Sequence, residues 1–207
     1  MKLDHGLQEY GWESASPLAD HSYNLPAIKS LLPPGKLNIL DAGCGNGFIA
    51  GQLSEMGHQV TAIDLSEDGV DIAKKKYPNV RFEVHSVYTE LNDLIDQVDV
   101  VVSSEVIEHL YYPQRFLKNV YSVIREGGCL ILTTPYHGYL KNLALSIFNK
   151  WDSHHTVDWE GGHIKFFSEK TISSMLKESG YNSVEFNNAG RIRWLWKSMV
   201  CRAQKER

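Results

Sequence analysis

A glycine-rich segment between an apolar run and a helical one most limits what this chain can fold into. The run Leu37–Asp41 has the composition of a buried strand and leads directly into Gly43-Cys44-Gly45-Asn46-Gly47. Phe48–Met56 then has helical character. Glycines suit such a turn because the backbone must bend tightly and let a ligand approach without Cβ atoms in the way. Strand, turn and helix together predict a nucleotide-type site, with a purely structural turn as the alternative.

Further strand-like runs alternate with helical stretches along the chain. They are Gln59–Asp64, Val80–His85, Val98–Ser103 and Gly128–Thr134. Such alternation is typical of parallel βαβ units, and the near-continuous apolar character of the last two runs predicts central strands covered on both faces. We therefore expect an α/β three-layer sandwich with a mostly parallel sheet.

The last third of the chain completes the expected sheet. A helix should begin at Pro113 and stop at Gly127-Gly128, and another should span Ser168–Ser179. Two closing strands, near Tyr181–Asn187 and Lys197–Ala203, bring the sheet to seven strands, with an antiparallel strand closing it.

The length and composition fit one domain over residues 1–207. We expect residues 1–34 to form a helical lid and residues 136–165 an insertion near the substrate pocket. The insertion carries an apolar stripe at helical spacing, which could line a pocket for a hydrophobic acceptor, rest on a membrane or belong to the core. Its members are Leu140, Leu143, Ala144, Ile147, Phe148 and Trp151.

Two acidic residues narrow the choice of ligand. Asp64 closes the second strand about 20 residues after the loop, where a carboxylate can accept hydrogen bonds from both hydroxyls of a ribose. Asp41 precedes the first glycine and would repel a pyrophosphate, whereas it would attract ammonium and sulfonium groups. Phe48 also stands where a dinucleotide fingerprint requires its third glycine. The loop therefore favours a cationic adenosine-type cofactor over NAD.

These residues also carry a family resemblance. The segment Leu40–Gly47 followed by Asp64 resembles the cofactor motif of class I S-adenosylmethionine-dependent methyltransferases. Residues Val101–Leu110 resemble the segment after the fourth strand in the branch related to ubiquinone-biosynthesis O-methyltransferases, and Arg125–Pro135 resembles the fifth-strand motif. The resemblance covers roughly residues 35–135. It implies a Rossmann-like fold, S-adenosyl-L-methionine as cofactor and methyl transfer as the reaction.

Carried over residue by residue, the resemblance implies a set of cofactor contacts. Asp41, Gly43 and Gly45 would hold the methionine end, and Asp64 would hold the ribose. The remaining positions would surround the adenine and the sulfonium: Leu65, Ser86 and Val87 at the adenine, Ser104 and Glu105 near the sulfonium, and Tyr23 from the lid. Ser86 departs from the family, where an aspartate is common, so the adenine contact there would rely on backbone groups.

The reaction itself needs a base only if the acceptor is a hydroxyl. A sulfonium leaves as a neutral thioether without acid assistance, but a hydroxyl must lose its proton, and histidine suits that task near neutral pH. Four histidines are expected beyond the carboxyl ends of the strands: His109, His137, His155 and His163. We select His163 and His109 as catalytic candidates. For each, a structural hydrogen-bonding role is the alternative.

No metal is expected. A loop cluster has the right residue types for zinc or iron, but adjacent histidines rarely point the same way and the chain has no HExxH helical pair. Its members are Asp152, His154, His155, Asp158 and His163. The three cysteines, Cys44, Cys129 and Cys201, are odd in number and widely spaced, so we expect free thiols.

Charge and hydropathy suggest the setting. With 21 basic and 25 acidic residues the net charge is −4, which is poorly suited to binding a nucleic acid. No apolar run approaches the roughly 20 residues of a membrane span, and the N-terminus has no export signal. We expect a cytoplasmic enzyme acting on a small molecule, with a hydrophobic acceptor as one option, and most simply at oxygen. The alternatives are a non-catalytic S-adenosylmethionine-binding module and a nucleic-acid methyltransferase.

Overall fold

The computed structural model describes residues 11–155, 162–190, 192 and 195–206. Residues 1–10 of the expected lid and residues 156–161 of the expected insertion, Asp158 included, lie outside this description. The elements, in chain order, are α1 (His21–Leu31), β1 (Asn38–Ala42), α2 (Phe48–Glu55), β2 (Gln59–Asp64), α3 (Glu67–Lys76), β3 (Arg81–Val84), β4 (Val98–Ser104), the 3-10 helix η1 (Ile107–His109), α4 (Pro113–Val123), β5 (Ile124–Pro135), α5 (Tyr139–Ile147), α6 (Trp151–His155), α7 (Glu169–Glu178), β6 (Ser183–Phe186) and β7 (Ser198–Gln204).

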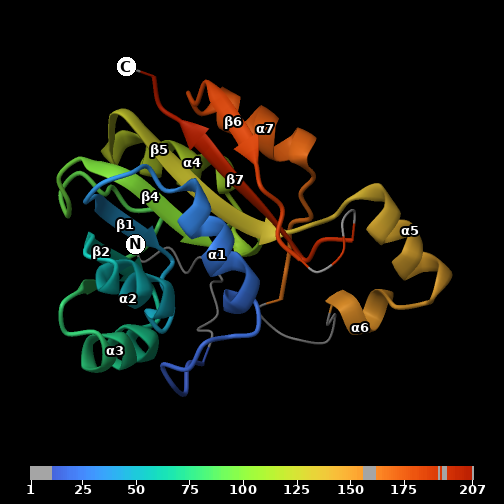
Figure 1. Cartoon of the computed structure of the whole chain (residues 1–207), viewed down its shortest axis with the longest axis horizontal. Helices are drawn as coiled ribbons and strands as arrows, with labels where there is room; N and C mark the ends of the chain where they lie inside the picture. Colours follow the sequence, from blue (N-terminus) through green and yellow to red (C-terminus); the bar gives the residue numbers. More distant parts are fainter. Residues whose placement is uncertain (1–10, 156–161, 191, 193–194, 207) are drawn as a thin grey trace, which may run out of the picture.

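A single seven-stranded sheet with the order β3-β2-β1-β4-β5-β7-β6 forms the centre of the molecule (Figure 1). The pairs among β1 to β5 are parallel, and β7 runs antiparallel to both β5 and β6. The expected Rossmann-like sandwich with a mostly parallel sheet and an antiparallel closing strand is confirmed. The strand order reverses between β1 and β4, and ligands in such sheets bind beyond the carboxyl ends of the strands near this switch point.

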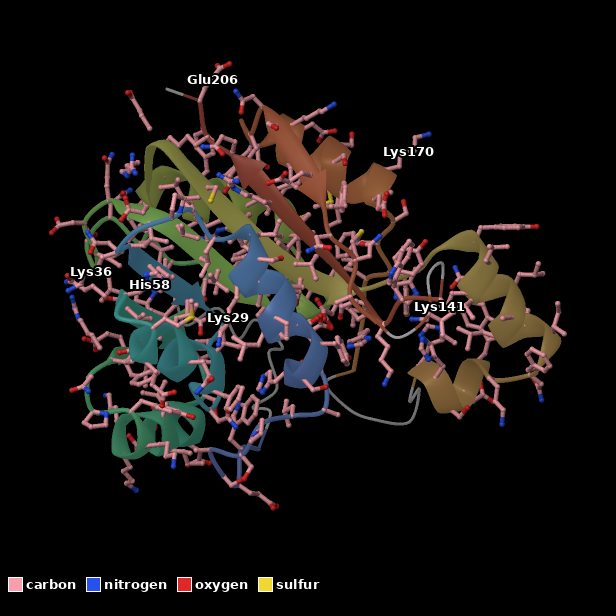
Figure 2. The ribbon with its side chains drawn as sticks, viewed as in Figure 1. Lys29, Lys36, His58, Lys141, Lys170 and Glu206 are labelled. Carbon is pink, nitrogen blue, oxygen red and sulfur yellow. The ribbon has the colours of Figure 1, made fainter. Side chains whose placement is uncertain are left out.

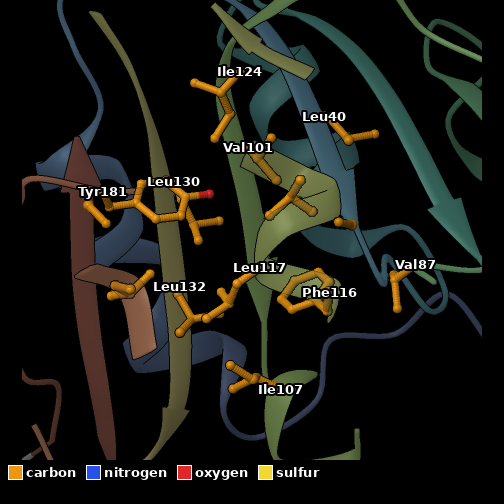
Figure 3. Packing of buried hydrophobic residues seen from close by; sticks show 14 of the residues in the cluster. Leu40, Val87, Val101, Ile107, Phe116, Leu117, Ile124, Leu130, Leu132 and Tyr181 are labelled. Atoms are coloured by element: carbon orange, nitrogen blue, oxygen red, sulfur yellow. The ribbon is translucent and has the colours of Figure 1, made fainter. Parts of the chain in front are cut away.

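Helices cover both faces of the sheet, so the molecule has two hydrophobic cores. Alternate residues of one strand face opposite cores: Val101 packs with Phe116 and Leu117 of α4, whereas Val100 and Val102 pack on the side of α1, α2 and α3. Figure 3 shows the first of these cores, with Leu130 and Leu132 of β5 beside Tyr181. Strands β4 and β5 are buried on both faces, as their continuous apolar sequences predict.

The boundary between α4 and β5 differs from the prediction. The helix was expected to continue to the glycines at 127 and 128, but it ends at Val123 and β5 begins at Ile124. Ile124 pairs with Val98 at the start of β4, and the pairing register shifts before Cys129. Pairing with the neighbouring strand outweighs the helical spacing, so Gly127 with its φ of 72° bends a strand and does not end a helix.

The insertion projects away from the sheet beyond the end of β5, where α5 and α6 form an arm at the side of the molecule (Figure 1). Its apolar stripe is largely exposed, Ile147 at 68% and Phe148 at 71%, so the core interpretation of these side chains is wrong. None of the helices that the structure describes is long and apolar enough to cross a membrane.

Candidate functional site

The glycine loop lies at the carboxyl end of β1 and opens onto the switch point of the sheet. The N–H groups of Gly43 and Cys44 donate to the carbonyl of Ile63, at 2.8 and 2.9 Å, which ties the loop to β2. Gly45 has a φ of 51°, and a Cβ added to it would meet the indole ring of Trp12. A side chain here is therefore disfavoured both by the backbone conformation and by its neighbour.

Asp41 and Asp64 bring two carboxylates to this loop. Asp41 is 1% exposed and its Oδ2 has no hydrogen-bond partner among the described residues. Burial, together with the nearby charge of Asp64, raises the pKa of Asp41 to about 7. The Asp64 oxygens accept from the N–H of Gly45 at 2.8 Å and from that of Ser66 at 2.9 Å. A buried carboxylate oxygen without a donor fits a cationic ligand, such as the ammonium group of the expected cofactor.

The residues expected around the adenine lie beside this pair of acids. Leu65 is 42% exposed, so its apolar side chain is free to cover a ring. Ser86 Oγ accepts from the N–H of Tyr88 at 3.2 Å. The side chain of Val87 is buried in the core beneath α4, and its carbonyl accepts from Asn119 Nδ2 at 2.8 Å. Val87 can therefore contribute to an adenine site chiefly through its backbone N–H.

The N-terminal segment lies directly on the loop. Asn46 Nδ2 donates to the carbonyls of Ser14 and Ser16, both at 2.9 Å, and Asn46 itself is 1% exposed. Trp12 sits against Gly45 and Gly69. Trp12 therefore covers the cofactor loop and the first turn of α3.

Glu105, directly after β4, joins α1 to the closing strand β7. Its Oε1 accepts from Asn24 Nδ2 at 3.0 Å, from Thr133 Oγ1 at 2.8 Å and from Ser198 Oγ at 2.8 Å. Its φ of 55° is a conformation that side-chain-bearing residues rarely adopt. Burial raises the pKa of the Glu105 carboxyl, and the side-chain donors oppose that shift.

The other polar residues of this group are held by β4 and β5. Ser104 Oγ and Thr133 Oγ1 are 3.0 Å apart. Tyr23 of α1 lies in the same region. Burial and the nearby charge of Glu105 both raise the pKa of its hydroxyl. Lys197 Nζ lies 5.5 Å from the centre of the Tyr23 ring.

The two histidines predicted to be catalytic lie close to each other and to a third residue, Glu108. The rings of His109 and His163 lie 4.9 Å apart, and His163 Nε2 is 4.0 Å from Glu108 Oε1. Glu108 is fully buried; its Oε2 accepts from Thr134 Oγ1 at 3.0 Å, whereas its Oε1 has no hydrogen-bond partner among the described residues. We call Glu108, His109 and His163 the proton cluster.

The ionisation of this cluster follows from its burial. Burial, and then the charge of Glu105, raises the pKa of Glu108 well above its usual range. Burial, followed by the neighbouring His109, lowers the pKa of His163 to about 4, so its ring is neutral near pH 7. The ligand atoms of all three residues lie within 4.8 Å of one another, close enough to hold a metal ion. Imidazole and carboxylate suit several divalent transition metals.

A backbone clamp fixes the position of His163. The N–H groups of Ile164 and Lys165 both donate to the carbonyl of Glu108 at 3.0 Å. The sequence analysis did not select Glu108. The signal that could have found it is the closeness of Glu105, Glu108 and His109, which lie within five residues directly after a central strand.

The remaining histidines form a separate group at the base of the insertion. His155 is 9% exposed and stacks on His137 at 5.6 Å, and Phe166 contacts both rings. Burial lowers the pKa values of His137 and His154 to about 4. Lys141 lies at this base, where α5 leaves the sheet (Figure 2), and its Nζ donates to the carbonyl of Tyr136 at 2.9 Å. The structure thus splits the four candidate histidines into two pairs.

Comparisons with known proteins show which proteins this chain is similar to. The profile described as "Methyltransferase domain" matches residues 18–185. The ubiquinone biosynthesis O-methyltransferase of Ruegeria sp. (strain TM1040) is 27% identical over 182 residues, which cover 82% of this chain and 70% of that protein. The mitochondrial ubiquinone biosynthesis O-methyltransferase of Rattus norvegicus is 30% identical over 206 residues, covering 87% of this chain but only 59% of the rat protein.

Solved structures support the fold. Magnesium protoporphyrin IX methyltransferase from Synechocystis, with bound S-adenosylhomocysteine (SAH), superposes with a TM-score of 0.66 at 19% identity. The match covers 88% of this chain and 84% of that one. An S-adenosylmethionine-dependent methyltransferase from Mesorhizobium loti gives a TM-score of 0.66 at 19% identity, with coverage of 87% and 96%.

Proposed function

Because the chain belongs to the methyltransferase family whose profile it matches, and is an S-adenosylmethionine-dependent methyltransferase, we propose that it methylates a hydroxyl oxygen of a small molecule. The observation that carries this proposal is the proton cluster. Two imidazoles and an unpartnered buried carboxylate oxygen meet beside Glu105, where an acceptor hydroxyl could lose its proton. The two named relatives are O-methyltransferases, which agrees with an oxygen acceptor.

When bound, S-adenosyl-L-methionine supplies a methyl group on a cationic sulfur, which leaves as a neutral thioether. Asp41 and the backbone of Gly43 and Gly45 would hold its methionine end, and Asp64 would accept hydrogen bonds from the ribose hydroxyls. Leu65, Ser86 and Val87 would border the adenine, while Tyr23, Ser104 and Glu105 would lie toward the sulfonium. The lid would exclude water from the reacting atoms, which favours transfer over hydrolysis.

The proton cluster would then act on the acceptor. His163 is neutral near pH 7 and can accept the hydroxyl proton, and Glu108, whose raised pKa favours its neutral form, would orient the His163 ring from 4.0 Å. His109 would orient the ring of His163. A divalent cation held by these three residues is the second candidate for this step, favoured by the convergence of their ligand atoms. Such an ion would lower the pKa of a bound hydroxyl.

The setting of the reaction is part of the same proposal. We take the chain as one domain, with residues 1–34 as the lid and residues 136–165 bordering the acceptor pocket. The net charge of −4 argues against a nucleic-acid substrate. The compartment we propose is the cytoplasm.

An acceptor screen with labelled cofactor tests the proposal. The protein is incubated with S-adenosylmethionine carrying a tritiated methyl group and with small molecules offering hydroxyl, amine or thiol groups. We expect label on an oxygen, and a loss of about 100-fold or more in kcat for His163→Ala, with SAH affinity unchanged. Label on nitrogen or sulfur alone would overturn the choice of acceptor. Tight SAH binding without any product would favour a non-catalytic binding module.

Chelation separates the two candidates for the proton step. If His163 acts as a base, treatment with EDTA leaves kcat unchanged, whereas a bound cation predicts loss of activity that added Mn²⁺ or Mg²⁺ restores. Glu108→Gln keeps the shape of the side chain but removes its charge, so it should abolish the restoration by metal.

A further inference from the structure

A surface groove near the chain segments that carry the proton cluster is lined by residues that the proposed reaction does not use. The groove has a volume of about 650 Å³ and lies between the start of α4 and residues 165–175. Six residues form its chemically distinctive lining: Tyr111, Tyr112, Arg115, Lys118, Lys165 and Phe167. Three of these are cations, and no acidic residue lines it within the part of the chain that the structure describes.

The cations approach from two opposite walls. Arg115 and Lys118 are three residues apart on α4, so they share one face of that helix. Lys165 comes from the segment on the other side, whose backbone is fixed by the carbonyl of Glu108. Phe167 is 6% exposed, whereas Tyr111 and Tyr112 are 54% and 60% exposed and provide an apolar surface beside the cations. Cations on two sides of an apolar surface fit an anionic group carried on an apolar body.

The α4 wall is braced from beneath by Tyr88, which is 4% exposed. Its hydroxyl accepts from the N–H of Tyr112 at 3.2 Å, and the two rings meet edge to face at 6.1 Å. The guanidinium carbon of Arg115 lies 5.9 Å from the centre of the Tyr88 ring. One carboxylate contacts the lining, because Gln114 Nε2 donates to Glu178 at 2.9 Å.

Both walls of the groove are joined to the proton cluster along the chain. Lys165 follows His163 by two residues, and Tyr111 follows His109 by two, so the Cα atoms within each pair are at most about 7 Å apart. A ligand with its anionic group in the groove would therefore reach the cluster with a hydroxyl a few bonds away.

We propose that this groove binds an anionic group, carboxylate or phosphate, of the methyl acceptor, whose apolar body lies on Tyr111 and Tyr112. This inference rests on the proposed function, since it assigns a chemical class to the acceptor of the same site. The inference about the groove is the same whether His163 or a bound cation acts on the acceptor hydroxyl.

A pair of fluorescent probes tests the groove without knowledge of the acceptor. 1-Anilinonaphthalene-8-sulfonate is an aromatic anion, and N-phenyl-1-naphthylamine is the same skeleton without the charge. With the cofactor site filled by SAH, the double variant Lys118→Glu, Lys165→Glu should weaken binding of the anion by about tenfold or more and leave the neutral probe within about twofold. The control, Lys74→Glu with Lys75→Glu on the exposed face of α3, changes the net charge equally and should affect neither probe.

The outcomes distinguish this inference from the proposed function. No binding of the anion to the wild type, or equal losses in the groove and control variants, would overturn the groove assignment. SAH affinity, measured on the same variants, should not change. In the acceptor screen, hydroxy acids paired with their methyl esters should show a lower KM for the acid in the wild type. The groove variant should lose that preference, and a wild type without it would contradict the inference.

Discussion

At the scale of the single residue, Asp41 links the cofactor site to pH. Its pKa is raised from 3.8 to about 7 by burial and by Asp64. In the free protein the carboxyl therefore contributes stability that is present below pH 3.8 and lost as the pH rises through about 7. Binding of an ammonium group favours the ionised form of Asp41, so cofactor affinity should rise as the pH rises.

Calorimetry tests this linkage through Asp41→Asn. For the wild type, SAH affinity should rise from about pH 6 to about pH 8, by at most about tenfold per unit, while the stability of the free protein falls. The variant should bind SAH more weakly at the higher pH and show a flatter pH profile. A wild type and a variant with identical pH slopes would show that Asp41 does not titrate on binding.

Gly45 offers a second test at the same scale. Gly45→Ala places a Cβ against Trp12 in a left-handed backbone conformation, with an expected loss of stability of about 1 kcal/mol from the conformation alone. Gly57→Ala is the matched control, because its φ of 90° imposes comparable strain while the space around it is open. Melting curves with and without SAH should show that both variants are destabilised and only Gly45→Ala binds SAH more weakly. Equal SAH affinity in both would contradict the role of the loop.

The residues of the site differed in how far sequence could predict them. Asp41 and Asp64 stand at fixed positions relative to a glycine loop, so a linear pattern identified both. Glu108 and His163 are 55 residues apart, and the backbone hydrogen bonds from Ile164 and Lys165 to Glu108 hold them together. An acidic residue next to a histidine reads as a surface turn until its burial is known.

At the scale of the element, the side chain of Asn46 holds the segment before α1 to the cofactor loop, together with the contact of Trp12. Asn46→Ala removes both hydrogen bonds to the carbonyls of Ser14 and Ser16. We expect faster dissociation of SAH and faster proteolysis within residues 12–16, because the segment over the loop would open more often. Asn92→Ala, which removes a single exposed contact to Ser122, is the control. Unchanged SAH dissociation in Asn46→Ala would show that this segment is not a lid.

Helix and strand boundaries show where local pattern was sufficient. The helix expected from Ser168 begins there, and the side chains of Ser66 and Ser168 both accept from the backbone N–H three residues on. The predicted end of α4 was wrong because the pairing of Ile124 with Val98 is a long-range contact that helical spacing does not reveal. The exposed stripe of α5 was ambiguous for a related reason, since a periodic apolar face does not say whether anything covers it.

At the scale of the whole molecule, five parallel strands and the closing pair were expected from the alternation of runs. The sheet order was fixed by tertiary pairing, with β7 inserted between β5 and β6. This order carries Ser198 to Glu105 and thereby ties the last strand to the cofactor end of the sheet. The site therefore draws on residues from the lid, the switch point and the closing strand, which only the complete fold assembles.

A crystal structure of the SAH complex would test the account most directly. We predict that Asp64 accepts hydrogen bonds from both ribose hydroxyls, that the ammonium group lies at Asp41, and that the sulfur faces the proton cluster. The sulfur should lie about 5 to 8 Å from His163 Nε2, which leaves room for one acceptor hydroxyl between them. A sulfur directed away from Glu108 and His163, with protein atoms filling the space between, would contradict the assignment.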